Sequence, residues 1–333
     1  MFELFRRPSR LAIICAIVTL MSLPAINVSA QNRALKVGLA TAGVAHMLLY
    51  IAESEGMFKA EGLDVQLVLF ASDAASAQGL TAGAVQVNSG SISSVINSHM
   101  TGRDLTTFWC ITNMPGYGWY GKPEFKSIKD LKGKGRIGVS SIASQTHRLS
   151  AWAVRAAGLD PEKDVQFLGV GGPMQRVAAL KAGQVDVIPA TPPGTYILER
   201  DGFRPILVLQ DIMPEFVYET FYARKATIEK DESAIRSMIR ATIKAKQWAE
   251  KNRDGATSIL MKKLGADASE RAIYRRTVDH ALPFYTDDGH FAEKSIDVFL
   301  EFFRDEGRIK TLPKHSAFTD YRFLDHFKTN PVP

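Results

Sequence analysis

Leu80–Val87 reads LTAGAVQV, and 100 residues later Leu180–Val187 reads LKAGQVDV. In both copies an apolar helix end precedes Ala-Gly, and two valines separated by one polar residue follow, as in a strand. Glycine suits the left-handed residue that ends a helix, because it has no Cβ to clash there. The pattern therefore predicts a helix, a glycine stop and a strand at each place.

The repeat extends well beyond these eight residues. Residues 36–39 (KVGL) match residues 136–139 (RIGV) at the same offset. The triplet GLD at 62–64 returns at 158–160, and after a short insertion at 161–164 the offset is 100 again. Each unit alternates strands and helices and has the size of half a domain, which is too long for a solenoid repeat. We therefore predict two α/β lobes of similar plan.

The lobe boundaries follow from glycine, proline and aromatic clusters. Such a cluster at 115–122 predicts the first crossing, and a strand-like run at 217–223 predicts the crossing back. We expect the first lobe to comprise residues 31–116 and 222–333. Residues 117–221 then form the second lobe.

Amino-acid composition and charge indicate the general class of the protein. The 333 residues are 46% hydrophobic and 23% charged, with a formal net charge of +6 and no dense Lys/Arg run. This composition is that of a globular protein long enough for two cores. It gives no indication of nucleic-acid binding.

The N-terminus has the features of a signal peptide. Arg6, Arg7 and Arg10 precede the apolar run 11–23, which is too short to span a bilayer, and Val-Ser-Ala follows at 28–30. We expect residues 1–30 to be removed by cleavage after Ala30 and the protein to be periplasmic; a retained anchor is the alternative. After cleavage one cysteine, Cys110, would remain, which excludes an internal disulfide and a cysteine-based metal site.

Ligand sites in open α/β sheets lie beyond the carboxyl ends of the strands, where helix N-termini offer free N–H groups. Four loops at such positions are rich in hydroxyl groups and lack Arg and Lys. Serine and threonine there are also ordinary helix caps. The candidate ligand-binding residues in these loops are Thr41, Gly43, Ser89, Gly90, Ser91, Ser140, Ser141, Ser144 and Thr191.

Five further residues are expected near the cleft between the lobes. His46 lies just inside the first helix, although capping or a solvent-facing position is the alternative. Trp119 stands at the predicted crossing, where it either stacks on a ligand or packs in the core. Ser72 and Asp73 open the second helix, and Asp73 with Glu219 would favour a ligand that carries an amine or a ring N–H.

The motifs of common enzymes are absent from the sequence. It contains no G-x-S-x-G elbow, no H-E-x-x-H, no paired-cysteine spacing and no phosphate loop of the G-x-x-x-x-G-K-[ST] type. We therefore predict no catalytic residues, no metal site and no cofactor.

An ordered set of short motifs carries a family resemblance. Residues 52–65 (AESEGMFKAEGLDV), 80–85 (LTAGAV) and 130–134 (DLKGK) resemble the solute-binding proteins of ABC importers, specifically the nitrate/sulfonate/taurine and thiamine-pyrimidine-precursor family. The resemblance covers about residues 35–260. It implies a type II periplasmic binding fold, with each lobe a mixed sheet flanked by helices and two hinge crossings between the lobes.

The resemblance also implies a function. The protein is expected to be a monomer that binds a small organic solute of sulfonate, carboxylate or pyrimidine type and closes by hinge motion. It is then expected to deliver the solute to a permease and its ATPase. The loops named above lie at the family's ligand positions, and their lack of basic residues disfavours nitrate. One enzymatic branch makes a thiamine pyrimidine with pyridoxal phosphate and carries a cysteine-rich motif that this chain lacks. An enzyme of that kind and a sensor domain are the alternatives.

Overall fold

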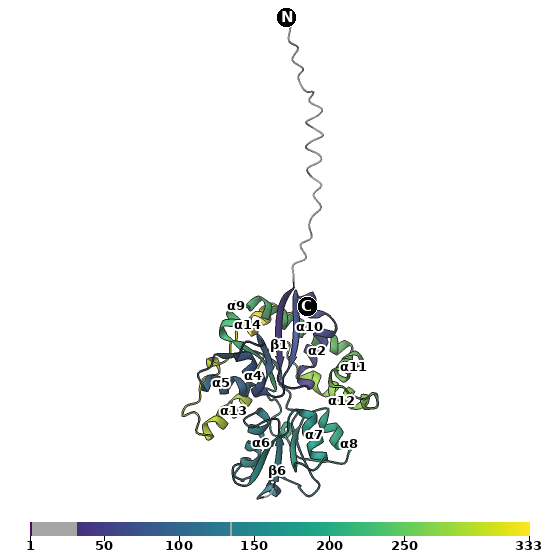
Figure 1. Ribbon diagram of the computed structural model, residues 1–333, viewed down its shortest axis with the longest axis vertical. Coiled ribbons are helices and arrows are strands. Elements are labelled where there is room, and N and C mark those ends of the chain that lie inside the picture. The colour runs from purple at the N-terminus through teal and green to yellow at the C-terminus, as the bar shows by residue number, and fades with distance from the viewer. Residues whose placement is uncertain (2–31, 134) are drawn as a thin grey trace. The chain divides into compact units, whose positions relative to one another are not determined.

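The computed structural model describes Met1, residues 32–133 and residues 135–333 (Figure 1). The predicted signal peptide and its cleavage position fall on residues outside this range, Met1 excepted. Among the described residues, no helix combines the length and the apolar character needed to cross a membrane.

The first lobe is built on a five-stranded mixed sheet. Its strands are β1 (Arg33–Leu39), β2 (Leu63–Leu69), β3 (Val87–Gly90), β4 (Leu105–Thr112) and β10 (Glu219–Arg224), in the order β2-β1-β3-β10-β4. β1 runs parallel to β2 and β3, whereas β10 is antiparallel to β3 and β4. Leu39 is opposite both Leu69 and Ser89, so three carboxyl ends meet at one edge of the sheet.

The second lobe repeats this arrangement. Its strands are β5 (Gly118–Gly121), β6 (Gly135–Val139), β7 (Val165–Gly169), β8 (Val187–Ala190) and β9 (Arg204–Val208), in the order β7-β6-β8-β5-β9. β6 is parallel to β7 and β8, and β5 is antiparallel to β8 and β9. The two-lobed α/β fold with a mixed sheet in each lobe is thereby confirmed.

The chain crosses between the sheets twice. Residues 113–117 connect β4 to β5, and residues 209–218 connect β9 to β10. The strand that follows each crossing is the antiparallel member of its new sheet. The sequence placed the return to the first lobe at residue 222, which lies inside β10, three residues after pairing with the first sheet has begun.

Helices flank both sheets. In Figure 1, α10 and α11 lie beside α2, and α13 lies near α5 and α6, in agreement with the contacts between these elements. The helices are α2 (Met47–Ser54), α3 (Met57–Ala60), α4 (Asp73–Thr81), α5 (Ile92–Met100), α6 (Gln145–Ala156), α7 (Pro173–Lys181), α8 (Gly194–Arg200), α9 (Lys225–Lys230), α10 (Glu232–Lys251), α11 (Arg253–Leu264), α12 (Arg271–Ala281), α13 (Glu293–Asp305) and α14 (Arg322–Thr329).

The repeated Ala-Gly pairs end α4 and α7 as the sequence predicts. Gly83 and Gly183 have φ angles of 80° and 70°, in the left-handed region that favours glycine. In the first copy the Ala84 N–H donates to the Gly79 carbonyl at 2.9 Å, and in the second the Gln184 N–H donates to Ala179 at 2.9 Å. These hydrogen bonds, each from an N–H to the carbonyl five residues earlier, satisfy carbonyl groups at the helix ends. Each glycine therefore has a structural role.

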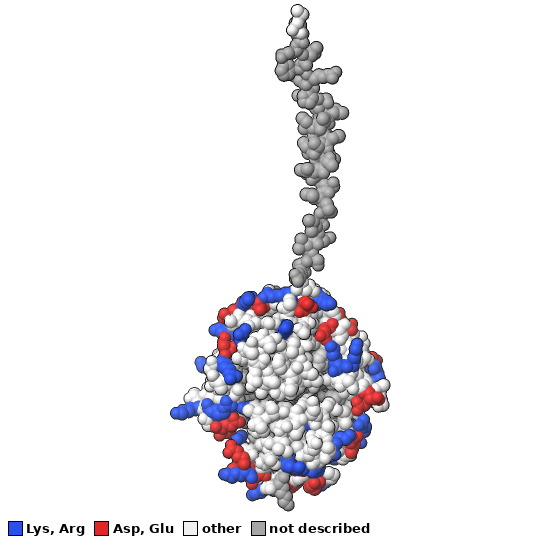
Figure 2. Space-filling view, viewed as in Figure 1, with Lys and Arg blue, Asp and Glu red and all other residues white. Residues whose placement is uncertain are grey.

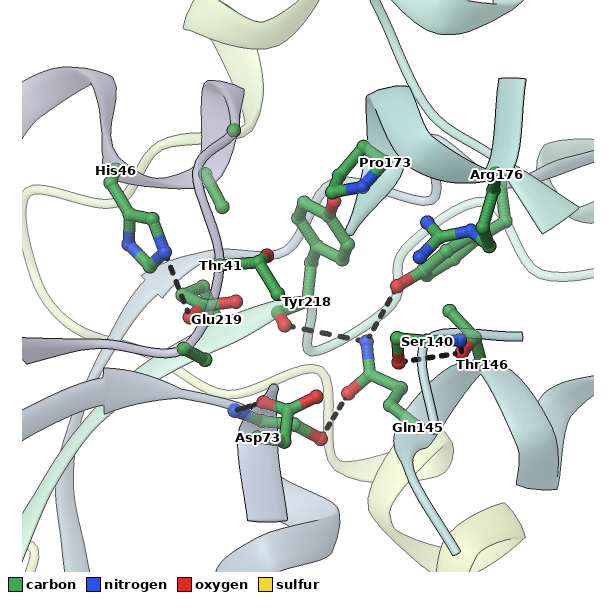
Figure 3. Close-up of a pocket in the computed structure, with 15 residues that line it drawn as sticks. Thr41, His46, Asp73, Ser140, Gln145, Thr146, Pro173, Arg176, Tyr218 and Glu219 are labelled. Carbon is green, nitrogen blue, oxygen red and sulfur yellow. Dashed lines mark hydrogen bonds and ion pairs between the residues drawn. The ribbon is translucent and has the colours of Figure 1, made fainter. Parts of the chain in front are cut away.

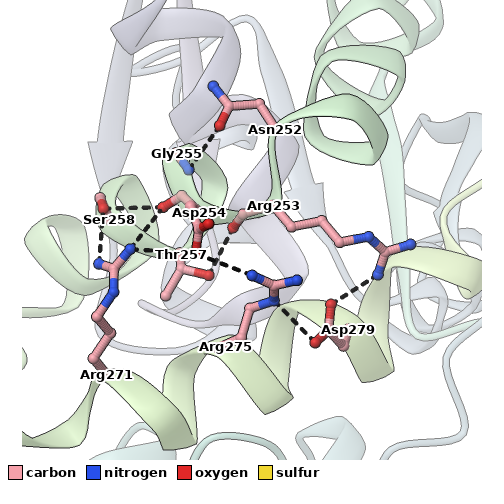
Figure 4. Close-up of polar contacts among 9 residues, drawn as sticks. All are labelled: Asn252, Arg253, Asp254, Gly255, Thr257, Ser258, Arg271, Arg275 and Asp279. Carbon is pink, nitrogen blue, oxygen red and sulfur yellow. Dashed lines mark hydrogen bonds and ion pairs between the residues drawn. The ribbon is translucent and has the colours of Figure 1, made fainter.

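Within the long helical region after residue 230, α10 and α11 pack against α2 of the first lobe. The apolar stripe of α10 is buried against the core, as its spacing predicts. Ion pairs link α11 and α12 at the surface: Arg275 contacts Asp254 and Asp279, both at 3.0 Å, and Arg253 contacts Asp279 at 2.8 Å (Figure 4). Because these side chains are exposed, each pair contributes about 1 kcal/mol or less.

Candidate functional site

A small enclosed cavity lies where the two lobes and both crossings meet (Figure 3). Its volume is about 30 Å³, which is enough for a water molecule. The lining residues are Ala40, Thr41, Gly43, Ala45, His46, Asp73, Ser91 and Glu219 from the first lobe, Ser140, Gln145, Thr146, Pro173 and Arg176 from the second, and Tyr117 and Tyr218 from the crossings.

The repeat explains why both lobes contribute equivalent positions. Four pairs of lining residues differ by 100 in number, because they occupy the same place after the same strand of each sheet. These pairs are Ala40 and Ser140, Ala45 and Gln145, His46 and Thr146, and Asp73 and Pro173.

Seven residues that the sequence nominated lie together in this cavity: Thr41, Gly43, His46, Asp73, Ser91, Ser140 and Glu219. They come from five separate segments of the chain. Parallel strand ends converge at one sheet edge, and this convergence brings them together.

The other seven nominated residues do not line the cavity. Ser89 and Gly90, expected in a loop, belong to β3 and are buried in the sheet. Ser72 and Ser144 cap α4 and α6 by accepting the N–H groups of Ala75 and His147. Trp119 is fully buried, and its Nε1 donates to Ser150 Oγ at 2.9 Å. Ser141 begins the turn before α6, and Thr191 is buried directly after β8.

Arg176 is the main lining residue that the sequence analysis missed. The four loops contain no Arg or Lys, but the cavity does contain a cation, because Arg176 reaches it from α7. A sequence signal existed. Asp73 is the only Asp, Glu, Lys or Arg in residues 65–102, and Arg176 is the only one in residues 165–180. Both of these isolated charges line the cavity.

The Arg176 guanidinium is buried and fixed by backbone carbonyls. Its Nε donates to Pro189 at 3.0 Å and its Nη1 donates to Gly171 at 3.1 Å. Burial lowers the pKa of Arg176, and the nearby Tyr117, Tyr218 and Asp73 partly offset this effect. An arginine at this position remains protonated at neutral pH, so the second lobe contributes a fixed positive charge to the cavity.

Two carboxyl groups of the first lobe face the same cavity. Asp73 accepts the Ser91 N–H at 3.2 Å, and burial raises its pKa. Burial, together with the charge of Asp73, raises the pKa of Glu219 well above its usual range. Glu219 Oε1 is buried and has no hydrogen-bond partner among the described residues. A buried acceptor of this kind is costly unless a donor reaches it.

His46 lies between Glu219 and Ser89. Its Nε2 is 3.7 Å from Glu219 Oε1, and its Nδ1 shares a 2.9 Å hydrogen bond with Ser89 Oγ. Burial lowers the pKa of His46 to about 4, so the ring is neutral at neutral pH. Although a carboxyl, an imidazole and a hydroxyl lie in a row, Ser89 is fully buried and does not line the cavity.

Gln145 connects the two lobes across the cavity. Its Oε1 accepts a hydrogen bond from Ser91 Oγ of the first lobe. Its Nε2 donates to Tyr117 Oη at 3.3 Å and to the Tyr218 carbonyl at 3.5 Å, both in the crossings. In this structure, protein groups of the two lobes and the crossings therefore bond to one another across the site.

No cluster of three or more metal-ligating side chains occurs among the described residues. What the site offers is a buried cation, two carboxyls with raised pKa values, hydroxyls and a side-chain amide. Such a set suits the recognition of a small polar molecule by charge and hydrogen bonds.

A family model described as "NMT1/THI5 like" matches residues 44–256, which is more than half of the sequence. The chain belongs to the NMT1/THI5-like family. The matched part of this NMT1/THI5-like chain contains every lining residue except Ala40, Thr41 and Gly43. The family resemblance drawn from the motifs is thus confirmed.

The relatives and solved structures that resemble this chain include proteins named as binding proteins. YtlA of Bacillus subtilis (strain 168), named as a binding protein, is 24% identical over 292 residues, 85% of each chain. The alkanesulfonate-binding protein SsuA from Xanthomonas axonopodis pv. citri, solved with MOPS bound, has a TM-score of 0.71 at 20% identity and covers 86% of this chain and 98% of its own. The periplasmic nitrate-binding protein NrtA from Synechocystis PCC 6803 has a TM-score of 0.72 at 16% identity, over 90% of this chain and 89% of its own. At these identities the two solved structures establish the fold and leave the ligand open.

Proposed function

We propose that this protein is the extracytoplasmic solute-binding component of an ABC importer, which holds a small organic solute between its lobes and delivers it to a permease. The observation that carries the proposal is the cavity itself, with Arg176 from one lobe facing Asp73 and Glu219 from the other (Figure 3). The sulfonate- and nitrate-binding neighbours support a binding role.

The charges of the cavity favour a ligand with two kinds of polar group. Arg176 favours an oxygen that carries negative charge, such as a sulfonate, a carboxylate or a polarised carbonyl. Glu219 Oε1 has no hydrogen-bond partner among the described residues, and in the protonated carboxyl that its raised pKa favours this oxygen either donates or accepts a hydrogen bond. An amino-sulfonate, an amino-carboxylate or an amino-pyrimidine that also carries a carbonyl oxygen meets both needs. Nitrate offers no donor and would lie near two carboxyls, so we propose that it binds poorly.

Ligand entry requires the lobes to separate. A cavity of about 30 Å³ is far smaller than the 300–1,000 Å³ or so of a typical ligand site. Gln145 would have to release Ser91 for the lobes to part. We propose that residues 113–117 and 209–218 act as the hinge and that a ligand replaces the direct bonds between the lobes on closure.

Thermal unfolding in the presence of a panel of solutes tests this proposal. The panel contains taurine, an alkanesulfonate, a dicarboxylate, an aminopyrimidine and nitrate, each at millimolar concentration. A ligand at 100 times its Kd stabilises the folded state by about 2.7 kcal/mol, a shift of several degrees in Tm. We expect a shift with a solute that has both a donor and an anionic group. A shift in Tm with nitrate alone would contradict the proposal that the ligand carries both a donor and an anionic group. The absence of a shift with every solute of the panel would contradict all of the proposed ligand types.

An enzymatic function on the same fold is the second candidate, because Glu219, His46 and Ser89 stand in the order of a hydrolytic triad. A nucleophile must reach the substrate, and Ser89 lies inside β3 with no access to the cavity. We therefore favour binding over hydrolysis. Turnover of sulfonate esters or carboxylate esters, or an absorbance change with pyridoxal phosphate and iron, would reverse this preference.

Export and oligomeric state belong to the same proposal. We propose that the chain is exported, that cleavage after Ala30 leaves Gln31 as the first residue, and that the mature protein is a periplasmic monomer. The mass of the protein recovered from the periplasm and light scattering of the purified protein test these points.

A further inference from the structure

A buried residue outside the cavity bonds to the turn that joins two lining residues of the second lobe. Ser140 and Thr146 line the cavity, and the turn between them, residues 141–144, leads into α6. The Ser144 N–H closes this turn on the Ser141 carbonyl at 3.2 Å. The turn joins these two lining residues but does not itself line the cavity, and the two residues also bond directly to each other, the Ser140 N–H donating to Thr146 Oγ1 at 2.9 Å.

The turn contains an unfavourable backbone conformation. Ala143 has φ = 64° and is the only residue other than glycine with a positive φ in the described part of the chain. The third position of a type II turn requires this conformation and normally carries glycine or asparagine. Alanine is strained there because of its Cβ, so other contacts have to hold the turn.

Arg148 supplies the contact that holds it. This residue lies on α6, one turn after the loop, and its Nη1 donates to the Ala143 carbonyl. Arg148 is 3% exposed, and burial lowers its pKa to about 10. A buried guanidinium needs partners, and the described residues of its own lobe give it only this carbonyl.

The other partners of Arg148 come from the first lobe. Its guanidinium lies 4.4 Å from the centre of the Phe303 ring, and its Nη2 is 3.8 Å from Glu306 Oε2. Phe303 lies in the last turn of α13, and Glu306 is the residue that directly follows this helix. Arg308 follows them and ties this segment to the first lobe by donating to Asn97 Oδ1 on α5 at 2.7 Å. A separation of the lobes would remove Phe303 and Glu306 from Arg148 and expose its guanidinium to water.

We propose that Arg148 is a positioning residue that couples lobe closure to the assembly of the ligand site. In the closed form, α13 covers Arg148 and fixes its guanidinium on Ala143, which keeps Ser140 and Thr146 in their binding positions. In the open form the hydrated guanidinium no longer fixes the turn, and this half of the site loosens. The inference rests on the proposed function for its purpose, since it describes how a binding cleft completes itself.

Hydrogen exchange of the unliganded full chain, read by mass spectrometry on peptides that cover residues 139–148, tests this inference without any solute. In Arg148→Met we expect exchange in this segment to become about tenfold faster. Arg148→Lys, which can still donate to the carbonyl, should recover part of the protection. Arg155→Met is the matched control, since Arg155 lines the same surface groove but has no hydrogen bond to the turn, and it should leave exchange unchanged.

Two further variants separate positioning from a general loss of stability. Glycine adopts a positive φ freely, so in an Ala143→Gly background the effect of Arg148→Met should fall to about threefold or less. Glu306→Gln, in the other lobe, should speed exchange in the same segment, whereas Asp305→Asn should not.

Three results would overturn the inference: unchanged exchange in Arg148→Met, an equal effect of Arg148→Met with glycine at 143, or faster exchange spread along the whole of α6. These readouts need no ligand, so they are independent of the solute panel. A positive exchange result with an unresponsive panel would mean that the coupling exists and the ligand class is wrong.

Discussion

The two lobes share one plan but contribute opposite chemistry to the cavity between them. After the first strand, the first lobe presents His46 and the second presents Thr146 at the equivalent place. On the helix after the second strand, the first lobe places Asp73 in the cavity and the second places Arg176. The repeated scaffold thus fixes where side chains point, and the differences between the copies give the cleft an acidic side and a basic side.

This comparison indicates how a duplicated α/β unit becomes a specific binding site. Two identical lobes would present the same charge from both sides of the cavity. These like charges would repel each other, and neither would have a partner of opposite sign. Here the carboxyls and the guanidinium lie on opposite sides, so a ligand with a donor at one end and an anionic group at the other can bridge the lobes. The predictions below alter one side at a time.

Removal of the charge on the basic side should have the largest effect. Arg176→Met leaves the carbonyls of Pro189 and Gly171 without their donor and Asp73 without a nearby cation. We expect a loss of about 2–5 kcal/mol in the free energy of unfolding. Ligand affinity should fall about 100-fold or more. Urea unfolding and calorimetric titration measure the two effects.

The control for this variant is Arg155→Met, which removes an arginine of the same lobe from the surface. It should change the unfolding free energy by about 0.5 kcal/mol or less. If both variants behave alike, Arg176 is an ordinary structural residue and the polarity of the cavity has no consequence for binding.

The histidine of the acidic side should control stability in mild acid. Its folded pKa is about 4, below the ordinary histidine value of 6.5, so the unfolded chain binds a proton at pH values at which the folded chain does not. The stability that comes from keeping His46 neutral is complete above pH 6.5 and is lost as the pH falls to 4. The difference in pKa corresponds to about 3 kcal/mol.

His46→Gln should remove this contribution, because glutamine does not titrate. The unfolding free energy of the variant should fall less than that of the wild type between pH 6.5 and 4. Thr146→Ala, at the equivalent place in the second lobe, should leave the pH profile unchanged. Parallel profiles for His46→Gln and wild type would show that another group governs the acid limb.

The carboxyl of Glu219 should act in the opposite direction at higher pH. Burial raises its folded pKa well above the ordinary glutamate value of 4.5, so the folded state holds a proton that the unfolded state releases. Stability is therefore lost as the pH rises above 4.5 toward the folded pKa. Between pH 6.5 and 8, where His46 is neutral in both states, Glu219→Gln should be more stable than the wild type and less dependent on pH. The measurement is the unfolding free energy from guanidinium titrations at several pH values. If this free energy depended on pH equally in the two proteins, the prediction would be wrong.

The smallest effects should come from the two equivalent turn positions, Gly43 and Ala143. Ala143→Gly relieves a positive φ and should raise the unfolding free energy by about 1 kcal/mol or less. Gly43 has φ = −178°, an extended conformation that any residue adopts, and an added Cβ would meet Pro173 at an ordinary 3.8 Å. Gly43→Ala should therefore change stability by about 0.5 kcal/mol or less. A large loss in Gly43→Ala would mean that the lobes approach more closely than this contact distance allows.

Much of the scaffold could be predicted from the repeated pattern alone. The glycine stops at 83 and 183 and the apolar stripe of α10 depend on local backbone and packing preferences, which leave a periodic signal in sequence. Seven of the nominated site residues line the cavity, because parallel strand ends must converge at one edge of a sheet. Arg176 could not be predicted from the residues of the loops alone, because a long side chain can reach a cleft from the first turn of a helix.

The sequence by itself determined two lobes of one plan, the positions of their strand ends and the family. Only the tertiary structure decided that Arg176 opposes Asp73 and Glu219, that Ser89 is closed off inside β3, and that Arg148 of one lobe lies under Phe303 of the other. The physical reason is that strands and helices follow from local periodicity and steric preference. The pairing of buried charges depends on which surfaces meet when segments distant in the chain pack together, and no local pattern records that.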